Sequence, residues 1–127
     1  MTLFVASKLL NVHPDLCRLA VAVGHRRDVQ VITGARSLDA ERVAIGAGLS
    51  DLAHPEDSRH VLTSARTLAT ALDLAPVPVV WSDIPAFVSL ATVVLSCASE
   101  LGIQVRWGGD WQHLRDFDHF ELADGNV

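Results

Sequence analysis

The stretch RWGGDWQHLRDFDHFEL, residues 106–122, says most about how this chain folds. Residues 103–107 lead into it as a β-rich run, and residues 119–122 form a second short run of the same kind. Between them, Gly108-Gly109 is typical of a turn. Short strands joined by turn-bearing connections pair antiparallel. The C-terminal part of the chain therefore predicts a small antiparallel sheet.

The N-terminal part predicts two helices around a short strand. Residues 14–27 carry apolar side chains at helical spacing, and Pro14 suits a first turn. Residues 29–32 form a short β-rich run. Ser37 is placed to cap a helix over residues 38–49, whose early acidic residues complement the helix dipole.

The middle of the chain predicts a strand and then a third helix. Residues 69–75 alternate, so that Asp73 shares a face with alanines while leucines occupy the other face. Ser82 can cap a helix whose wide apolar stripe runs through residues 84–101. Gly102 then stands where a helix-ending glycine is expected.

Together these elements predict an α+β fold with about three helices and a small, largely antiparallel sheet, in a single domain of residues 1–127. Hydrophobic residues make up 50% of the chain and charged residues 20%, which is a globular composition. The formal net charge of -5 argues against binding nucleic acid through bulk charge. We expect a monomer that recognises its substrate through a local site.

Cysteine usage and hydropathy argue against a thiolate zinc site, a signal peptide and a membrane span. Cys17 and Cys97 stand among apolar residues, which predicts two buried free thiols, and no Cys-x-x-Cys spacing suggests a thiolate zinc site. The apolar run at the N-terminus is too short for a signal peptide, and no continuous run of about 18 apolar residues suggests a membrane span. The sequence therefore predicts synthesis in the cytoplasm without a signal peptide.

Two places in the sequence are candidates for chemistry, one at Asp73 and one around His119. Asp73 lies on a strand between two leucines, where a carboxylate is costly to bury unless it is paired or coordinated. Asp116 precedes His119 by three residues, and a carboxylate near a metal-bound histidine can accept a proton from water. A turn-capping aspartate and an aromatic turn with a solvated acidic edge are the structural alternatives.

Four segments carry a resemblance to a known family. Residues 106–122 resemble the C-terminal signature of the zinc peptidases that comprise D-alanyl-D-alanine carboxypeptidases and L-alanyl-D-glutamate endopeptidases, phage endolysins among them. The segments SKLLNVHPDL (7–16), GARS (34–37) and ALDLAP (71–76) resemble its other segments, in the expected order. The resemblance covers nearly the whole chain, and it implies the fold of hedgehog-type and D-Ala-D-Ala metallopeptidases.

The resemblance also implies roles for individual residues. Asp73 and His119 would bind zinc (Zn2+) together with a second histidine, and Asp116 would act as the general base. Arg36, in the segment that resembles Gly-x-Arg-Ser, would steady the substrate oxyanion or carboxylate. Further substrate contacts are expected from three residues: Ser58, Trp107 and Asp110.

The first histidine ligand is where the chain departs from the family pattern Ser-x-His-x-x-Gly-x-Ala-x-Asp. A gap-free count back from Asp73 puts Arg66 in the ligand place, and a guanidinium offers no lone pair to a metal. Ser58-Arg59-His60 also fits Ser-x-His, with His60 13 residues before Asp73. Extra residues in a surface connection cost little loop entropy, so His60 is the preferred ligand, and His54 is a distant third choice.

The implied function is a zinc-dependent endopeptidase that cuts the L-Ala–D-Glu bond of the peptidoglycan stem peptide. Such an enzyme would act on the bacterial cell wall, as an endolysin does on the wall of its host. Two alternatives stay open: a wall-peptide-binding domain without catalysis, if Arg66 displaces the ligand, and a D-Ala–D-Ala carboxypeptidase.

Overall fold

The computed structural model describes residues 6–37, 40, 59–64, 66–110 and 116–123. The elements, in chain order, are η1 (Ala6–Leu9), α1 (Pro14–Arg26), β1 (Val29–Thr33), β2 (Ala71–Pro76), α3 (Ile84–Leu101), β3 (Val105–Trp107), η3 (Gly108–Asp110) and β4 (His119–Leu122). The helix predicted over residues 38–49 lies outside the described residues, except for residue 40. The predicted Gly-Gly turn is the short 3-10 helix η3.

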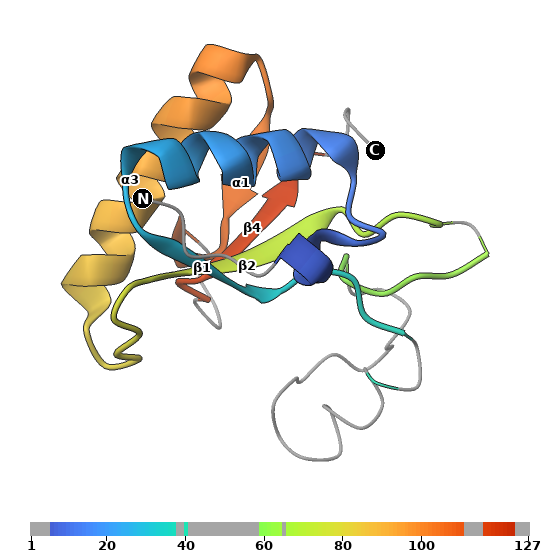
Figure 1. Ribbon diagram of the computed structural model, residues 1–127, viewed down its shortest axis with the longest axis horizontal. Coiled ribbons are helices and arrows are strands. Elements are labelled where there is room, and N and C mark those ends of the chain that lie inside the picture. The colour runs from blue at the N-terminus through green and yellow to red at the C-terminus, as the bar shows by residue number, and fades with distance from the viewer. Residues whose placement is uncertain (1–5, 38–39, 41–58, 65, 111–115, 124–127) are drawn as a thin grey trace.

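The four strands form one sheet in the order β1-β2-β4-β3, and every neighbouring pair is antiparallel (Figure 1). This confirms the predicted α+β fold with a small antiparallel sheet. The order also places β4, the last strand in the sequence, in the interior of the sheet. A register shift between Val31 and Thr33 bends β1 beside β2, so that Thr33 pairs with Asp73.

Both long helices cover the same face of the sheet (Figure 1). Their buried residues join the alternate side chains of the strands in a single core. The core includes Leu16, Leu19 and Val23 of α1, Leu90 and Val94 of α3, and Leu72, Leu74, Phe120 and Leu122 of the sheet. Because side chains alternate along a strand, the residues between these leucines point to the opposite face.

Helix α3 agrees with the prediction except at its N-cap. Asp83, and not Ser82, is the N-cap, because the Asp83 carboxylate accepts a hydrogen bond from the backbone N–H of Ala86 at 3.2 Å. Gly102 ends the helix in the left-handed conformation, with φ 72°. With a mean hydropathy of 1.7 over 18 residues, α3 is long and apolar enough to cross a membrane, although its Phe87–Leu90–Val94 side is buried in the core.

Two strands begin later than predicted, because their first residues bond elsewhere. The backbone of Ala69 is bonded to Asn11 and His13, and the N–H of Thr70 donates to Arg59 O, so β2 begins at Ala71. The N–H of Ile103 closes the end of α3, so β3 begins at Val105. Both cysteines are free, and Cys97 is buried as predicted, whereas Cys17 is only partly buried.

Candidate active site

Two of the predicted residues face each other across the sheet. In the β2–β4 ladder Asp73 is paired with His119. The neighbours of Asp73 and His119 along the chain, Leu72 and Phe120, belong to the core. Alternation therefore puts the Asp73 carboxylate and the His119 imidazole together on the face that the helices leave uncovered.

His60 reaches the same place from a loop. The Arg59 carbonyl accepts a hydrogen bond from Thr70 N at 2.8 Å, directly before β2. The carbonyl of His60 itself accepts one from Arg36 N at 2.7 Å. These two backbone bonds hold the loop residue between the start of β2 and the segment that follows β1.

The three side chains converge on one carboxylate oxygen. His60 Nε2 and His119 Nδ1 each lie 3.3 Å from Asp73 Oδ1, and the two rings meet edge to face, with centroids 5.2 Å apart. All three side chains are largely buried, with 7%, 9% and 13% of the His60, His119 and Asp73 side chains exposed. Among the described residues, Asp73 Oδ1 is buried and has no hydrogen bond of good geometry.

Each imidazole is oriented through its other nitrogen. His60 Nδ1 donates to the carbonyl oxygen of Gly34 at 2.8 Å, and His119 Nε2 donates to Glu121 Oε1 at 2.9 Å. Carbonyl and carboxylate oxygens can only accept, so the remaining nitrogen of each neutral ring carries a lone pair toward Asp73. Histidine ligands of metals are oriented in this way.

The charges of the cluster depend on one another. Burial opposes the ionisation of Asp73, but the His60 and His119 imidazoles outweigh it and hold the pKa of Asp73 well below its ordinary value. Burial also disfavours the charged form of His119, yet the neighbouring Asp73 and Glu121 carboxylates raise the pKa of His119 to about 10. Burial similarly raises the pKa of Glu121, and the facing His119 imidazole more than reverses this, leaving a lowered value.

Two more carboxylates border the cluster. Oxygens of Asp73, Asp116 and Asp118 all lie within 4.8 Å of one another. The Asp116 backbone N–H donates to Gly108 O at 3.1 Å, and a Cβ on Gly108 would lie 2.2 Å from Asp116 O, so only glycine permits this close approach. Burial, followed by the hydrogen bond to Asp116, raises the pKa of Asp118 to about 9.

The donor set fits a zinc ion. One ligand atom from each of His60, Asp73 and His119 lies within 4.8 Å of the others. Two imidazoles and a carboxylate are a donor set that a catalytic zinc site uses, with a further coordination position left for water or substrate. A cation between them would also satisfy the orphaned Asp73 oxygen.

The other predicted site residues that the structure describes are Arg36, Trp107 and Asp110. The backbone of Arg36 bridges to Val61, next to His60. Trp107 Nε1 donates to Phe117 O at 2.8 Å, so this indole braces the segment that leads to His119. Asp110 is exposed at the end of η3.

Arg66 occupies the loop between His60 and β2. Its Nη1 donates to the Val61 carbonyl at 3.3 Å, and the structure brings His60 and not Arg66 beside Asp73. Ser58 and His54 lie outside the described residues.

Sequence reasoning missed three contributors to the site, namely Gly34, Asp118 and Glu121. Glu121 was detectable, because it lies two residues after His119 on the same strand face. The roles of the Gly34 carbonyl and the Asp118 carboxyl depend on contacts that no local pattern reveals.

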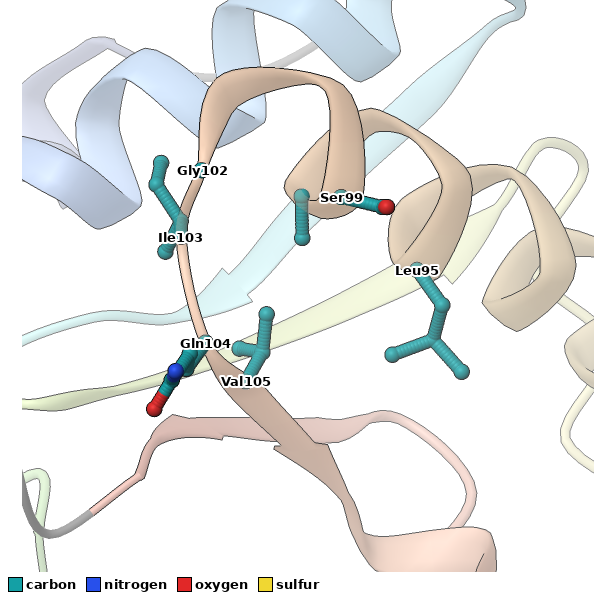
Figure 2. A pocket seen from close by; sticks show the side chains of 7 residues that line it. Leu95, Ser99, Gly102, Ile103, Gln104 and Val105 are labelled. Atoms are coloured by element: carbon teal, nitrogen blue, oxygen red, sulfur yellow. The ribbon is translucent and has the colours of Figure 1, made fainter.

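A cavity of about 430 Å³ between the end of α3 and the start of β3 is a poor candidate for chemistry. Figure 2 shows the lining, with Leu95 and Ser99 on α3 and Ile103, Gln104 and Val105 on the segment that follows Gly102. Its described lining contains no titratable side chain, so it supplies no acid, base or metal ligand.

Known proteins share both the sequence and the fold. The family described as phage L-alanyl-D-glutamate peptidase matches residues 3–125. The L-alanyl-D-glutamate peptidase of Escherichia phage T5 is 30% identical over 123 residues, which are 93% of this chain and 85% of that protein. The crystal structure of the Serratia marcescens L-Ala D-Glu endopeptidase ChiX is similar with a TM-score of 0.79, at 30% identity over 99% of this chain and 92% of that one. The chain thus belongs to the phage L-alanyl-D-glutamate peptidase family.

Proposed function

We propose that this chain is a zinc-dependent endopeptidase that hydrolyses the amide bond between L-alanine and D-glutamate in the peptidoglycan stem peptide. The observation that carries the proposal is the convergence of His60 and His119 on the unsatisfied Asp73 oxygen. The phage T5 relative is an L-alanyl-D-glutamate peptidase and the Serratia relative is an L-Ala D-Glu endopeptidase, which supports cleavage of this bond. They favour it over the D-Ala–D-Ala bond of a carboxypeptidase.

His60 Nε2, Asp73 Oδ1 and His119 Nδ1 would hold the zinc ion. When bound, zinc supplies a Lewis acid that polarises a carbonyl group and makes water acidic near neutral pH. Gly34 and Glu121 would keep the two imidazoles in position to bind the ion, because each accepts a hydrogen bond from the ring nitrogen that faces away from Asp73. Because these two contacts already restrict the rings, the two histidines would lose less rotational freedom when the ion binds.

Asp116 would serve as the general base. Its carboxylate lies within 4.8 Å of the Asp73 carboxylate, so it stands at the border of the ligand set without being one of the three converging groups. In that position it can take a proton from the attacking water and return it to the leaving amine. Asp118, hydrogen-bonded to Asp116, holds this carboxylate in place.

Arg36 would balance negative charge on the substrate. The Arg36 N–H donates to the His60 carbonyl, and the Arg36 carbonyl accepts from the Leu62 N–H. The backbone of Arg36 is therefore held beside Val61, the residue directly after His60. A guanidinium stays protonated at all physiological pH values and forms charge-assisted hydrogen bonds to oxyanions and carboxylates. We expect the protein to work on bacterial wall peptide as a monomer.

Purified peptidoglycan and mass spectrometry test the proposal. Zinc-loaded protein should release fragments that end in L-alanine and fragments that begin with D-glutamate, and chelation should stop the release. New D-alanine termini without L-alanine termini would assign the other peptidase activity. Wall binding without any new terminus would assign a binding domain.

A further inference from the structure

A second cavity, of about 480 Å³, is lined by Gly34, whose carbonyl accepts the hydrogen bond from His60. It lies among η1, the end of β1 and the segment 34–37. The described residues that line it include two cations, Lys8 and Arg36, and no carboxylate. The hydrogen-bonding side chains of Asn11, Thr33 and Ser37 also line it.

Three lining residues connect this cavity to the histidine–aspartate cluster. Gly34 lines the cavity and its carbonyl accepts the hydrogen bond from His60 Nδ1. Thr33 lines it and is the β-ladder partner of Asp73. Arg36 lines it and donates its backbone N–H to His60 O. The cavity and the histidine–aspartate cluster are therefore built on the same segment, residues 33–36.

We propose that Lys8 and Arg36 form a subsite for the free α-carboxylate of the D-glutamate whose amide nitrogen is released. The inference rests on the proposed function. In a stem peptide this carboxylate is borne by the carbon next to the scissile nitrogen, whereas the γ-carboxyl is tied up in the following amide bond. The carboxylate carbon is two bonds from the scissile nitrogen, so a cationic pocket that binds this anion has to lie next to the active site.

The geometry of Lys8 suits this task. Within the described residues its Nζ donates to the Ile32 carbonyl at 3.1 Å, and an ammonium group has three N–H donors. The carbonyl of Lys8 lies so close to Gly34 that a Cβ there would stand 1.9 Å from it. The backbone that bears the ammonium is thus packed against the residue that orients His60.

Asn11 fixes the other side of the cavity. It adopts the left-handed conformation, with φ 60°, and its carbonyl accepts the Ala69 N–H at 2.8 Å. Asparagine is among the few side chains that tolerate this conformation. This turn brings η1 back toward β1, and Lys8 with it.

The subsite predicts discrimination between a carboxylate and a carboxamide. The two groups have nearly the same shape, but a carboxamide is neutral and presents donors to two cations. Loss of one charge-assisted hydrogen bond corresponds to about a ten- to hundredfold change. Zinc-loaded wild type should therefore have a kcat/KM about ten- to hundredfold higher for acetyl-L-Ala-γ-D-Glu-L-Lys than for the same peptide with D-isoglutamine.

Variants of Lys8 test the assignment on that substrate pair. Lys8→Met should reduce the preference to less than about threefold, chiefly by raising KM for the free acid, with zinc content unchanged. Lys8→Arg should keep most of the preference, because the cation remains. Arg18→Gln removes an exposed cation of α1 and should leave the preference at the wild-type value.

Binding separates a failed subsite from a failed function. Calorimetry would compare the product γ-D-Glu-L-Lys with its D-isoglutaminyl analogue. Equal cleavage and equal binding of both peptides by wild type would overturn the subsite and leave the peptidase intact. Absence of cleavage together with Lys8-dependent preference for the acid product would uphold the subsite and overturn the peptidase. An unaltered preference in Lys8→Met would also overturn the subsite.

Discussion

The two imidazoles of the site lie at the same distance from Asp73, but different groups hold them in orientation. Each lies 3.3 Å from the same Asp73 oxygen. His119 stands on β4 and is oriented by the side chain of Glu121, whereas His60 stands on a loop and is oriented by the backbone carbonyl of Gly34. A side-chain support can be removed by mutation or protonation, and a backbone support cannot. The orientation of His119, the ligand on the strand, is therefore the one that mutation or pH can change.

Removal of either ligand should have the largest effect. His60→Ala and His119→Ala should each reduce zinc from about one ion per chain to a trace and abolish wall hydrolysis, because two protein ligands rarely retain catalytic zinc. Zinc analysis of dialysed protein measures this, with exposed His25→Ala as the control. Normal zinc content in His60→Ala would mean that His60 is not the first histidine ligand, and that Arg66 or His54 stands at that position of the family pattern.

Loss of the base should come next. Asp116→Asn should keep zinc and lower kcat by about 10²–10⁴-fold, because asparagine preserves the shape but cannot accept a proton. Turbidity loss of purified walls and zinc analysis together measure the two quantities. Asp15→Asn on α1 controls for the loss of one carboxylate. Near-normal turnover in Asp116→Asn would remove this residue from catalysis.

The contrast in support makes a sharper prediction for Glu121. Glu121→Ala should weaken zinc binding by about 10–100-fold, as loss of a group that orients a ligand does. Competition with a chromogenic chelator gives the affinity, and the exposed Glu100→Ala serves for comparison. An unchanged affinity would mean that the strand alone fixes the His119 ring.

The pH dependence follows from the same contact. The pKa of His119 in metal-free protein is about 10, above its ordinary 6.5. The ion pairs of His119 therefore stabilise the metal-free fold fully below pH 6.5 and less as the pH rises through 10. Zinc must displace this proton, so its apparent affinity should fall about tenfold per unit as the pH falls from 9 to 7. A flat profile by calorimetry would contradict the protonated state.

The smallest effect is expected at Arg66. Arg66→Ala should lower the free energy of unfolding by about 1 kcal/mol, through the lost bond to the Val61 carbonyl, and leave zinc content unchanged. Arg66→His should add no second zinc. Urea unfolding and zinc analysis measure both. Zinc uptake that depends on Arg66→His would favour the gap-free alignment.

The sequence predicted the parts of this site that local patterns encode. Strand alternation placed Asp73 opposite the leucine face, and periodicity with a terminal glycine gave the extent of α3. His60 was ambiguous because its position depends on contacts between residues distant in the sequence. Arg36 N–H donates to the His60 carbonyl, and Thr70 N–H donates to the carbonyl of Arg59, the residue before His60. The same holds for Lys8, whose cavity is assembled from segments that the sequence separates.

The strand order has a consequence for synthesis of the protein. Because β4 lies between β2 and β3, the sheet of a growing chain cannot be completed until residues 119–122 have left the ribosome. His119 arrives with that strand, 46 positions after its partner Asp73 in the sequence. A nascent chain thus stays without the His119 ligand until translation has passed β4, so the complete ligand set appears only when the sheet closes.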